Sequence, residues 1–349
     1  MKNYNKNIVS KNISIREAFE RMNELGSKLT LFIVDESNAL VGTLTDGDIR
    51  RSFLKGLSVA ESVEKCMFLN FRYISKSNLT PTLLKEFRDK KIRLVPILDE
   101  HKRILNIIDL EETKAMLPIN AVIMAGGKGE RLWPLTKNKP KPLLTVGDKP
   151  IIEHNIDWLI AHGVSNITIT VKYLAEQIED YFKDGKEKNI SISYVKENEP
   201  LGTIGALKLA NDTTEDTVLV MNSDLLTNIN FEDFYLEFIE KNADMAVATI
   251  PYKVNIPYAI VETENDTIIS LKEKPTYTYY SNAGIYLIKK PLIDFIPSNQ
   301  KYDATDFIEL LLSKGKKVIY FPILNYWLDI GKPEDYEKAN EDIKHIDFN

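Results

Sequence analysis

The stretch MAGGKGERLWPLTKNKPKPLL (residues 124–144) decides the fold class of the chain. It follows directly on the apolar run Ile119–Ala125 and contains three glycines, one arginine, four lysines and three prolines. A buried strand that ends in such a loop is typical of an open α/β sheet, in which ligands bind beyond the carboxyl ends of the strands. Backbone N–H groups at the glycines, together with the cations, predict a ligand that carries several phosphates.

The spacing of this loop excludes two common phosphate-binding motifs. A P-loop needs a lysine followed by Ser or Thr, whereas Lys128 is followed by a glycine. The dinucleotide fingerprint needs a third glycine where Leu132 stands and a helix directly after it, but Pro134 prevents an uninterrupted helix. The glycines, Arg131 and the Pro-Lys-Pro segment around Lys141 therefore form a different kind of phosphate site.

Length and composition limit the class of protein. The chain has 349 residues, enough for two domains, and its 44% hydrophobic and 28% charged residues are ordinary for a globular protein. The net charge of −6 argues against a broad surface for nucleic acid or anionic membranes, so any basic site is local. The single cysteine, Cys66, excludes an internal disulfide and fits a reducing cytoplasm.

No targeting or membrane segment is expected. The N-terminus MKNYNKNIVSKN is polar and lacks the apolar core of a signal peptide. No apolar run approaches the ~20 residues that a membrane helix needs. We therefore expect a cytoplasmic protein without a membrane partner.

Strands and helices alternate after Pro118, which predicts a mostly parallel sheet covered on both faces. The predicted strands are Ile119–Ala125, Asn166–Val171, Ile190–Tyr194, Val218–Met221, Met245–Ile250, Ile260–Glu262, Ile268–Lys272, Ala283–Ile288 and Lys317–Phe321. The predicted helices are Ile151–His162, Leu174–Lys183, Thr203–Ala210, Phe231–Lys241, Pro291–Phe295, Ala304–Ser313 and Pro333–Ile343. The glycine-rich loop begins at the carboxyl end of the first strand, where such sheets bind ligands.

An internal repeat precedes the α/β region. Residues 14–26 are predicted to be helical, with Ser14 and Glu17 forming a capping box, and two strands follow. The pattern returns further on, because LVPILDE (94–100) matches LFIVDE (31–36) and RILNII (103–108) matches ALVGTL (39–44). One such unit buries little surface, so the two copies are expected to pack together. A helix stopped by Pro118 is expected to end the repeat.

The segment IVDESNALVGTLTDGDIRRSFLKG (33–56) resembles the strand–strand–helix core of a CBS domain, and residues 1–117 resemble a CBS pair (about 1–58 and 59–117). In that family a hydroxyl residue followed three positions later by Asp holds adenosine nucleotides. Thr45 and Asp48 match this pattern and are candidates for a regulatory nucleotide site; a plain helix N-cap is the alternative. The second copy departs from it, because Asp109 stands at the equivalent place and repels phosphate.

The loop G-G-x-G-x-R-L-x-P-L-T followed by P-K-P-L-L resembles the signature of sugar-1-phosphate nucleotidyltransferases. Further segments appear in the order of that family: ENEPLGTIGAL (197–207), MNSDLL (221–226), ISLKEKP (269–275), SNAGIY (281–286) and YWLDIGKPEDY (326–336). The resemblance covers residues 119 to about 345 and implies a transferase domain, 118–349, with a Rossmann-like (GT-A-like), mixed, mostly parallel sheet. An α+β CBS pair would precede it.

The resemblance implies a reaction of a nucleoside triphosphate (NTP) with a sugar-1-phosphate, giving an NDP-sugar and pyrophosphate. With the CBS pair in front, the chain is similar to a bacterial subgroup of glucosamine-1-phosphate guanylyltransferases in nonulosonate (legionaminic acid) pathways. Mannose- or heptose-1-phosphate guanylyltransferases and glucose-1-phosphate thymidylyl- or uridylyltransferases are the alternatives. A nucleotide-sensing binding protein that has lost activity is the non-enzymatic one. We expect Mg²⁺ as the cofactor, a homo-oligomer and no nucleic-acid partner.

The family's site residues map onto matching positions of this chain. Arg131 would steady the β- and γ-phosphates, Lys141 would reach the α-phosphate, and Asp224 and Asp329 would hold Mg²⁺. The implied nucleotide-binding residues are Ala125, Gly126, Gly127, Gly129, Glu197, Gly202 and Thr203. The implied sugar-binding residues are Glu273, Lys274, Asn282 and Gly284.

Glu197 indicates which nucleobase of the NTP the chain binds. Relatives that use uracil or thymine carry Gln near this place, and a carboxylate offers only acceptors. Guanine presents two adjacent donors, N1–H and N2–H, which a carboxylate accepts side by side, so GTP is favoured. The alternative is a solvent-facing Glu197 in the polar segment KENE.

Simpler structural roles remain open for several other candidates. Asp224 could cap a turn, and Glu273 with Lys274 could be an exposed strand end. His154 and His162 lie too far apart on one predicted helix for a zinc pair.

Overall fold

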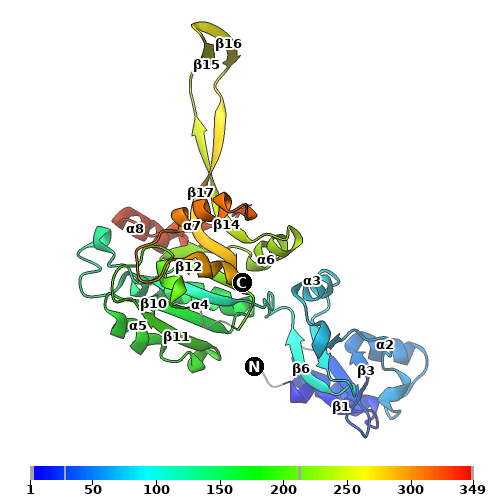
Figure 1. The fold of residues 1–349 in the computed structure, drawn as a ribbon. Coiled ribbons are helices and arrows are strands. Elements are labelled where there is room, and N and C mark those ends of the chain that lie inside the picture. The colour runs from blue at the N-terminus through cyan, green and yellow to red at the C-terminus, as the bar shows by residue number, and fades with distance from the viewer. Residues whose placement is uncertain (1–3, 27–28, 211–213, 347–349) are drawn as a thin grey trace. The chain divides into compact units, whose positions relative to one another are not determined.

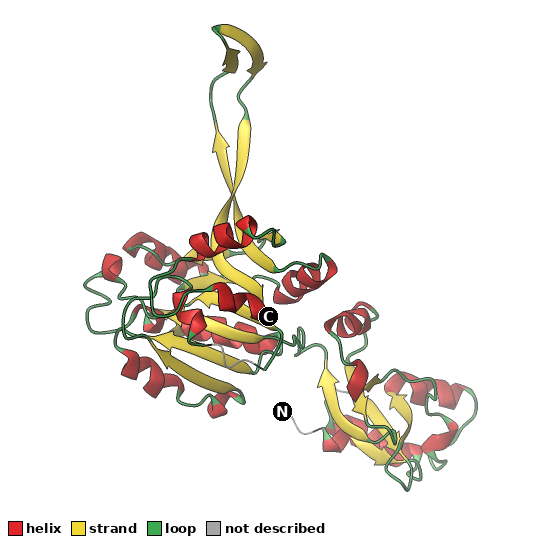
Figure 2. Cartoon of the chain, viewed as in Figure 1, coloured by secondary structure: helices red, strands yellow, loops and turns green. Residues whose placement is uncertain are grey.

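The structure is a computed structural model of the chain and describes residues 4–26, 29–210 and 214–346. The chain divides into two compact units, Met1–Met116 and Leu117–Asn349. Figure 1 traces the chain through both units, and Figure 2 marks their helices and strands. Across the described residues, no helix combines the length and the apolar character that crossing a membrane would require.

Within the described residues, the first unit contains two three-stranded sheets, β1-β2-β3 and β4-β5-β6. Its strands are β1 (Ile8–Ser10), β2 (Thr30–Val34), β3 (Leu40–Thr45), β4 (Ile74–Ser75), β5 (Leu94–Leu98) and β6 (Ile104–Asp109). Its helices are α1 (Ile15–Glu24), α2 (Asp46–Leu54) and α3 (Pro81–Asp89), and its 3-10 turns are η1 (Asn5–Asn7), η2 (Val63–Lys65) and η3 (Lys76–Asn78).

The two sheets repeat one topology. In each, the first two strands run parallel and the second and third run antiparallel. The hairpin turns close alike, because Asp35 N–H donates to Ala39 O and Asp99 N–H donates to Arg103 O, both at 3.0 Å. The predicted capping box of Ser14 is present at the start of α1. The internal repeat read from the sequence is therefore a structural repeat.

One apolar cluster joins the two copies. Phe32 and Leu40 come from the first copy, and Leu94, Leu98 and Ile107 come from the second. All five side chains are buried, so each copy covers apolar surface that it could not bury alone. The expected packing of one copy on the other is confirmed.

The helix expected before Pro118 was predicted wrongly, because residues 110–117 form a turn and then irregular backbone. Asp109 stops helix formation locally: its Oδ1 accepts a hydrogen bond from Glu111 N–H at 3.1 Å. Short polar side chains that bond to nearby backbone N–H groups favour turns over helix interiors. The second copy therefore has no counterpart of α2 in this part of the chain.

The second unit is built on a seven-stranded sheet in the order β11-β10-β7-β12-β17-β14-β18 (Figure 1). Its strands are β7 (Asn120–Ala125), β8 (Thr145–Val146), β9 (Lys149–Pro150), β10 (Asn166–Val171), β11 (Ser191–Lys196), β12 (Thr217–Asn222), β13 (Leu225–Thr227), β14 (Met245–Asn255), β15 (Ile260–Glu264), β16 (Thr267–Lys272), β17 (Thr276–Lys289), β18 (Val318–Pro322) and β19 (Trp327–Asp329). Only β17 runs antiparallel to its neighbours in this sheet, so the expected mixed, mostly parallel α/β sheet is confirmed.

Helices cover both faces of this sheet. They are α4 (Ile151–Ala161), α5 (Ala175–Phe182), α6 (Phe231–Glu240), α7 (Ala304–Ser313) and α8 (Pro333–Asp342), with the 3-10 turns η4 (Glu130–Leu132), η5 (Lys141–Leu143), η6 (Lys186–Lys188), η7 (Gly205–Lys208) and η8 (Lys290–Phe295). On one face, α7, η7 and η8 share a core with Val122, Val220 and Val318 of the sheet. On the other face, Phe234 of α6 contacts Phe321 of β18, with ring centroids 5.0 Å apart.

Two predicted helices of this unit are 3-10 turns instead. Residues 203–210 do not form an α-helix because the N–H groups of Ile204 and Gly205 donate to Tyr302 O at 3.2 and 3.1 Å. These bonds tie the first turn to another segment of the chain. The segment predicted as helix 291–295 is η8, a 3-10 turn that ends in extended backbone at Ile296. The other predicted helices of this unit are confirmed to within about two residues.

Two strands are much longer than the sequence predicts. After Thr249, β14 no longer pairs with β18, and before Asn282, β17 does not pair with β12. In these parts the two strands pair with each other. They end in the β15–β16 hairpin, whose turn residues Asn265 and Asp266 both have positive φ. This turn suits the twist of a two-residue hairpin. We call residues 251–280 the β-ribbon; Figure 1 shows it projecting from the sheet.

Candidate active site

Two aspartates meet beyond the carboxyl end of β12. Asp224 follows this strand, and Asp329 ends β19. The short strands β13 and β19 pair antiparallel, with Leu225 opposite Asp329, and Ile330 N–H donates to Asp224 O at 3.1 Å. This two-stranded sheet therefore holds the two carboxylates side by side, although their segments are far apart in the sequence.

Lys141 joins the two carboxylates. Its side chain is 11% exposed, and its ammonium group forms an ion pair with Asp224 Oδ2 and lies 3.8 Å from Asp329 Oδ1. Lys141 opens η5, and the prolines on either side of it are buried. Proline fixes the backbone torsion φ, so this lysine is aimed at the carboxylates instead of lying free on the surface.

The environment of Asp329 favours a bound cation. Burial and the negative charge of Asp224 raise the pKa of Asp329 to about 6, while Lys141 and Arg131 act in the opposite direction. Asp329 Oδ1 is buried and accepts no hydrogen bond from the described residues. Hard carboxylate oxygens are the ligands that Mg²⁺ prefers, commonly with phosphate oxygens completing its shell. The residues present therefore fit the Mg²⁺ ion expected from the sequence.

No larger metal cluster accompanies this pair: groups of three or more His, Cys, Asp or Glu side chains suited to a metal ion are absent from the part of the chain that the structure describes. His154 and His162 each bond to a backbone carbonyl, Val146 O and Trp158 O, both at 2.8 Å. Two carboxylates alone suit an ion that a nucleotide's phosphates also hold.

The glycine-rich loop passes directly beside Lys141. Gly129 has a φ of 65°, and a Cβ added there would lie 3.0 Å from the Cβ of Lys141. Thr136 Oγ1 donates to Gly129 O at 2.7 Å and fixes this turn. Only glycine allows this approach with a left-handed backbone, so the loop and the lysine occupy one site.

Arg131 also reaches this site. It lies in η4, directly after the glycines, and its side chain is exposed. A Cβ added at Gly331, two residues after Asp329, would lie 3.5 Å from Arg131 Nη1. The guanidinium group is close enough to lower the pKa of Asp329. The structure thus brings Arg131, Lys141, Asp224 and Asp329 together, as the sequence predicted for a phosphate site.

Glu197 lies against the start of the glycine-rich loop. Its side chain is buried, and its Oε2 accepts a hydrogen bond from Leu201 N–H at 3.1 Å. A Cβ added at Gly126 would lie 2.9 Å from the Cδ of Glu197. The alternative of a solvent-facing Glu197 is therefore wrong, because the carboxylate fills the space that a side chain at position 126 would need.

Two predicted nucleotide-binding residues have contacts elsewhere. Gly202 has a φ of 79°, and a Cβ there would lie 2.6 Å from Tyr302 O. Thr203 N–H donates to Asp303 Oδ1 at 2.9 Å, and Thr203 Oγ1 accepts from Ala304 N–H at 2.8 Å. These bonds tie the segment to the start of α7. A role of Gly202 and Thr203 in nucleotide binding stays a prediction.

The predicted sugar-binding residues fall into two separate places. Gly284 lies at the site: its N–H donates to Asn282 Oδ1 at 2.9 Å, and a Cβ there would lie 3.0 Å from the Cγ of Asn222. Glu273 and Lys274 instead lie on the β-ribbon, where both are exposed. Asn282 lies six positions after Thr276 on β17, which corresponds to about 20 Å of strand. This structure therefore does not bring Glu273 and Lys274 to the carboxylate pair.

Asn155 supports the site and was missed in the sequence. Its Nδ2 donates to Leu225 O at 2.8 Å, directly after Asp224, and its side chain is buried in α4. A buried amide must find hydrogen-bond partners, and here the partner is the first residue of β13, directly after Asp224. The signal was available: Asn155 is a polar residue inside an apolar predicted helix.

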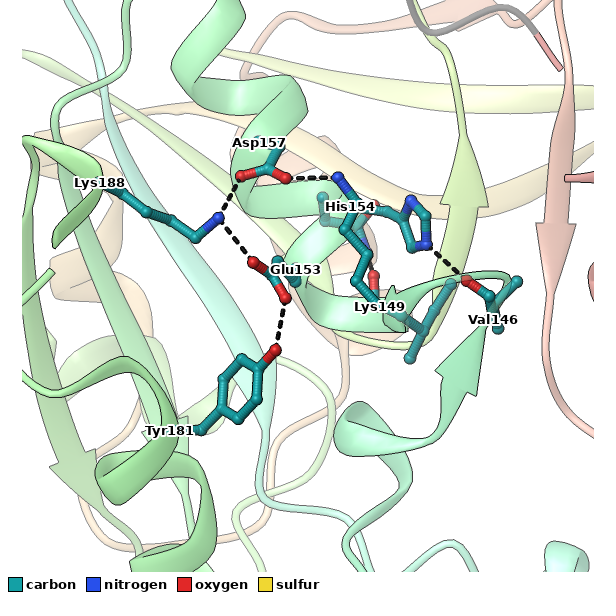
Figure 3. A network of polar contacts seen from close by, with 9 residues as sticks. Val146, Lys149, Glu153, His154, Asp157, Tyr181 and Lys188 are labelled. Atoms are coloured by element: carbon teal, nitrogen blue, oxygen red, sulfur yellow. Dashed lines mark hydrogen bonds and ion pairs between the residues drawn. The ribbon is translucent and has the colours of Figure 1, made fainter.

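A polar network fixes α4 to its neighbours (Figure 3). Lys188 Nζ lies 2.6 Å from Glu153 Oε1 and 2.7 Å from Asp157 Oδ1, and Tyr181 OH donates to Glu153 Oε2 at 2.7 Å. Burial and this hydrogen bond raise the pKa of Tyr181 to about 12. Burial alone would lower the pKa of Lys188, but the two carboxylates outweigh it and raise that pKa. The network ties α5 and η6 to the helix that carries Asn155.

His154, beside this network, predicts a pH-dependent stability. Burial lowers the pKa of His154 from its ordinary 6.5, and Nε2–H donates to Val146 O (Figure 3). Below about pH 6.5 the imidazole of His154 is protonated in the unfolded chain but stays neutral in the folded protein. The free energy of unfolding therefore decreases as the pH is lowered. We expect His154→Gln to lose less melting temperature than the native protein between about pH 7.5 and about pH 5.5.

The control for this experiment is His101→Gln, an exposed histidine in a hairpin turn. This variant should keep the native protein's loss of melting temperature in the same thermal scans. Equal losses of melting temperature in His154→Gln and the native protein would show that His154 takes up its proton equally in the folded and the unfolded state, contrary to the prediction.

In the first unit, Thr45 and Asp48 form a capping box at the start of α2. Thr45 Oγ1 donates to Asp48 Oδ2 at 2.6 Å, and Thr45 N–H donates to the same oxygen at 2.9 Å. The capping role read as an alternative is therefore present. Asp48 also lines a cavity of about 310 Å³ with Arg51, Lys55 and Lys65. A regulatory nucleotide at this place stays a prediction.

Comparisons with known proteins agree with this α/β fold. Bifunctional protein GlmU of Methanocaldococcus jannaschii is 36% identical over 64% of this chain and 54% of that protein. A D-glycero-alpha-D-manno-heptose 1-phosphate guanylyltransferase of Aneurinibacillus thermoaerophilus is 33% identical over 65% of this chain and 99% of that protein. The chain thus spans about half of the first relative and almost all of the second.

Solved structures show the same fold. A structure described as a glucose-1-phosphate thymidylyltransferase from Bacillus anthracis matches 66% of this chain and 97% of that chain, with a TM-score of 0.55 and 26% identity. HddC from Yersinia pseudotuberculosis matches 64% of this chain and 99% of that chain, with a TM-score of 0.52 and 28% identity. It was also solved in complex with GMP-PN, with a TM-score of 0.51.

The fold and these relatives define a class of enzymes, the sugar-1-phosphate nucleotidyltransferases. Residues 120–346 match the model of the nucleotidyl transferase family, and this chain belongs to that family. Residues 5–55 match the CBS domain family. The second CBS copy and the division of the chain at residue 117 stay predictions.

Proposed function

We propose that the chain catalyses the reaction of GTP with a sugar-1-phosphate, giving a GDP-sugar and pyrophosphate. The observation that carries the proposal is the buried Lys141 between Asp224 and Asp329, directly beside the glycine-rich loop. Membership of the nucleotidyl transferase family supports the reaction class and argues against the alternative of an inactive nucleotide sensor.

The reaction joins two polyanions. A phosphate oxygen of the sugar-1-phosphate forms a bond to the α-phosphorus of GTP, and the bond from that phosphorus to the bridging oxygen breaks, releasing pyrophosphate. The second pKa of a phosphate ester is about 6, so the attacking oxygen is already ionised at neutral pH and needs no strong general base. Positioning and charge stabilisation must supply the catalysis.

Each residue of the site has a part in this stabilisation. Lys141 is oriented by its prolines toward the α-phosphate, and Arg131 steadies the departing pyrophosphate. Backbone N–H groups of Gly126 and Gly127 hold the remaining phosphate oxygens. Asp224 and Asp329 would hold Mg²⁺, which neutralises phosphate charge when bound.

We assign the choice of base to Glu197. Its carboxylate accepts a hydrogen bond from Leu201 N–H and fills the space that a Cβ at Gly126 would need, at the start of the glycine-rich loop. A fixed acceptor group suits the adjacent N1–H and N2–H donors of guanine. One relative named a heptose 1-phosphate guanylyltransferase, 99% of whose length is matched by this chain, supports the same choice.

Replacing Glu197 by glutamine therefore tests the base. The amide brings a donor against the guanine donors, and we expect kcat/KM for GTP to fall by about 30-fold, equivalent to about 2 kcal/mol. Turnover of UTP should fall less or rise. The measurement is the steady-state rate of the variant with each of the four NTPs.

A matched control lies two residues away. Glu199 has a side chain that is 86% exposed, so Glu199→Gln should keep the native NTP preference. A native enzyme that prefers UTP or dTTP would reject the assignment of GTP, and so would a Glu197→Gln variant with an unchanged NTP preference.

For the sugar we propose glucosamine-1-phosphate, on the CBS-containing subgroup that the sequence resembles. Mannose-1-phosphate and heptose-1-phosphate with GTP, and glucose-1-phosphate with dTTP or UTP, are the competing pairs, and the relatives include enzymes named for several of them. A matrix of these sugar phosphates against the NTPs, read as pyrophosphate release with and without Mg²⁺, identifies the pair. No release in any cell of the matrix would refute the proposed reaction.

A further inference from the structure

The loop of residues 126–140 joins β7 to η5 and carries the cations of the phosphate site. Arg131 lies in its first part, within the short turn η4, and Lys141 follows directly after its end. A connecting segment of this kind lacks the ladder of hydrogen bonds that holds a helix or a strand, so its position depends on side-chain contacts. The geometry of the phosphate site therefore depends on what fixes this loop.

One contact holds the loop to itself. Thr136 is fully buried, and its Oγ1 donates to Gly129 O at 2.7 Å. Its Cγ2 would lie 3.2 Å from a Cβ added at Gly129, so the two residues are packed against each other. Any group that holds the backbone at residue 136 therefore also holds the glycine turn directly before Arg131.

Three consecutive carbonyl groups of the loop accept hydrogen bonds from two side chains at α5. Tyr173 OH donates to Lys137 O at 2.7 Å and lies 3.2 Å from Thr136 O. Gln177 Nε2 donates to Asn138 O at 3.1 Å. Carbonyl groups that already have a partner are not free to rotate away, so these contacts restrain the backbone of residues 136–138.

Tyr173 is itself fixed by the main sheet. Val171 ends β10 and pairs with Ala125, which ends β7, so Tyr173 follows one strand and the loop follows its neighbour. After Tyr173, the side chains of Ala175 and Ile178 in α5 are buried. A tyrosine side chain has few torsions, so fixing it costs little conformational entropy. Tyr173 therefore joins the far part of the loop to the sheet from which the loop starts.

We propose that Tyr173 is a positioning residue for nucleotidyl transfer: its hydroxyl group holds residues 136–138 and thereby places Arg131 and Lys141 for the phosphates of the NTP. This inference rests on the proposed function. The two cations lie on either side of the restrained segment in the sequence, so one contact serves both. Misplacing a catalytic group by about 1 Å can cost about 10²-fold in rate, which makes such a restraint matter for turnover.

Replacing Tyr173 by phenylalanine removes the hydroxyl group and keeps the ring. We expect kcat/KM for GTP to fall by about tenfold, the scale of one lost hydrogen bond. KM for the sugar-1-phosphate should stay within about twofold, because the predicted sugar residues Asn282 and Gly284 lie on β17. The melting temperature should stay close to that of the native protein, so the loss of rate reports on placement of the phosphate site.

The matched control is Tyr194→Phe. Tyr194 OH donates to Lys183 O at 2.7 Å, at the other end of α5, so this variant loses a similar hydrogen bond outside the loop. It should keep the native kcat/KM for GTP. Native kinetics in Tyr173→Phe, or equal losses of kcat/KM in the two variants, would overturn the inference and leave the proposed function intact.

Cleavage of the full chain by trypsin gives a second measurement that does not depend on activity. Trypsin cuts after Lys137, an exposed residue, and attacks the same carbonyl group that accepts the hydrogen bond of Tyr173. Cleavage of a folded protein follows the population in which the segment is open. Tyr173→Phe should therefore be cut after Lys137 about tenfold faster than the native protein, and Tyr194→Phe at the native rate.

The two measurements separate failure of the inference from failure of the proposed function. A loss of kcat/KM in Tyr173→Phe with unchanged cleavage after Lys137 would show that the hydroxyl group does not act through the loop. If the native protein turns over no substrate pair, the proposed function fails. In that case faster cleavage of Tyr173→Phe still supports the restraint of the loop by Tyr173, and equal cleavage overturns it.

Discussion

Replacing Asp224 by asparagine is expected to lower the turnover of GTP and sugar-1-phosphate by about 10³-fold or more. Asp224 and Asp329 present carboxylate oxygens side by side across the β13–β19 pair. The amide keeps the shape of the aspartate but loses the charge that would hold Mg²⁺. The measurement is pyrophosphate release at saturating Mg²⁺, with thermal unfolding to verify that the variant is folded.

The matched control for this variant is Asp294→Asn. Asp294 belongs to the same unit, its side chain is 71% exposed, and its Oδ1 lies 2.8 Å from Lys208 Nζ. Removing the charge of Asp294 should change turnover by less than about twofold. A folded Asp224→Asn variant that keeps more than about a tenth of native turnover would exclude Asp224 as a metal ligand.

Replacing Lys141 by methionine is expected to lower turnover by about 10²-fold and to lower the melting temperature of the metal-free protein as well. Without the ammonium group, the carboxylates of Asp224 and Asp329 face each other, with the Arg131 guanidinium nearby. We expect a loss of about 2 kcal/mol in the free energy of unfolding, less than for a fully buried pair because the Asp224 side chain is 21% exposed. Methionine keeps the apolar stem, so the loss reports on the charge.

Two measurements check this variant. Thermal unfolding in EDTA should show the loss, and added Mg²⁺ should recover more melting temperature in Lys141→Met than in the native protein, because no lysine competes for the carboxylates. Lys139→Met, at an exposed lysine two residues earlier, should match the native protein in both assays. Native stability in EDTA together with native turnover would refute the role assigned to Lys141.

Local sequence patterns predicted the phosphate side of the site. Gly129, Arg131 and Lys141 come from one continuous segment, so their spacing alone predicted a phosphate-binding loop after β7. Glu197 was predicted for its chemistry, and the structure adds that its carboxylate lies against that loop. The pairing of Asp224 with Asp329 depended on family resemblance, because β13 and β19 have three residues each and show no alternation.

The strands β15 and β16 at the tip of the β-ribbon were predicted, but the extension of β14 and β17 into the β-ribbon could not be predicted from hydrophobic periodicity. The pattern predicted strands that stop at Ile250 and begin at Ala283, where burial by the main sheet stops and starts. Between those points β14 and β17 pair with each other and both faces of the pair are largely exposed. Burial therefore does not alternate along this part of the strands. Glu273 and Lys274 were assigned to the sugar site because the segment ISLKEKP resembles the family, whereas this structure has both residues exposed on the β-ribbon.

Position 126 links two properties of this protein that are usually considered apart. The space above its Cα is filled by the carboxylate of Glu197, so glycine is needed there to seat an acidic side chain as well as to admit a phosphate. A single methyl group at this point would push the acid aside without touching any charge. Under the role proposed for Glu197, the tolerance of this loop for substitution and the selectivity among nucleobases would both depend on the same few cubic ångströms.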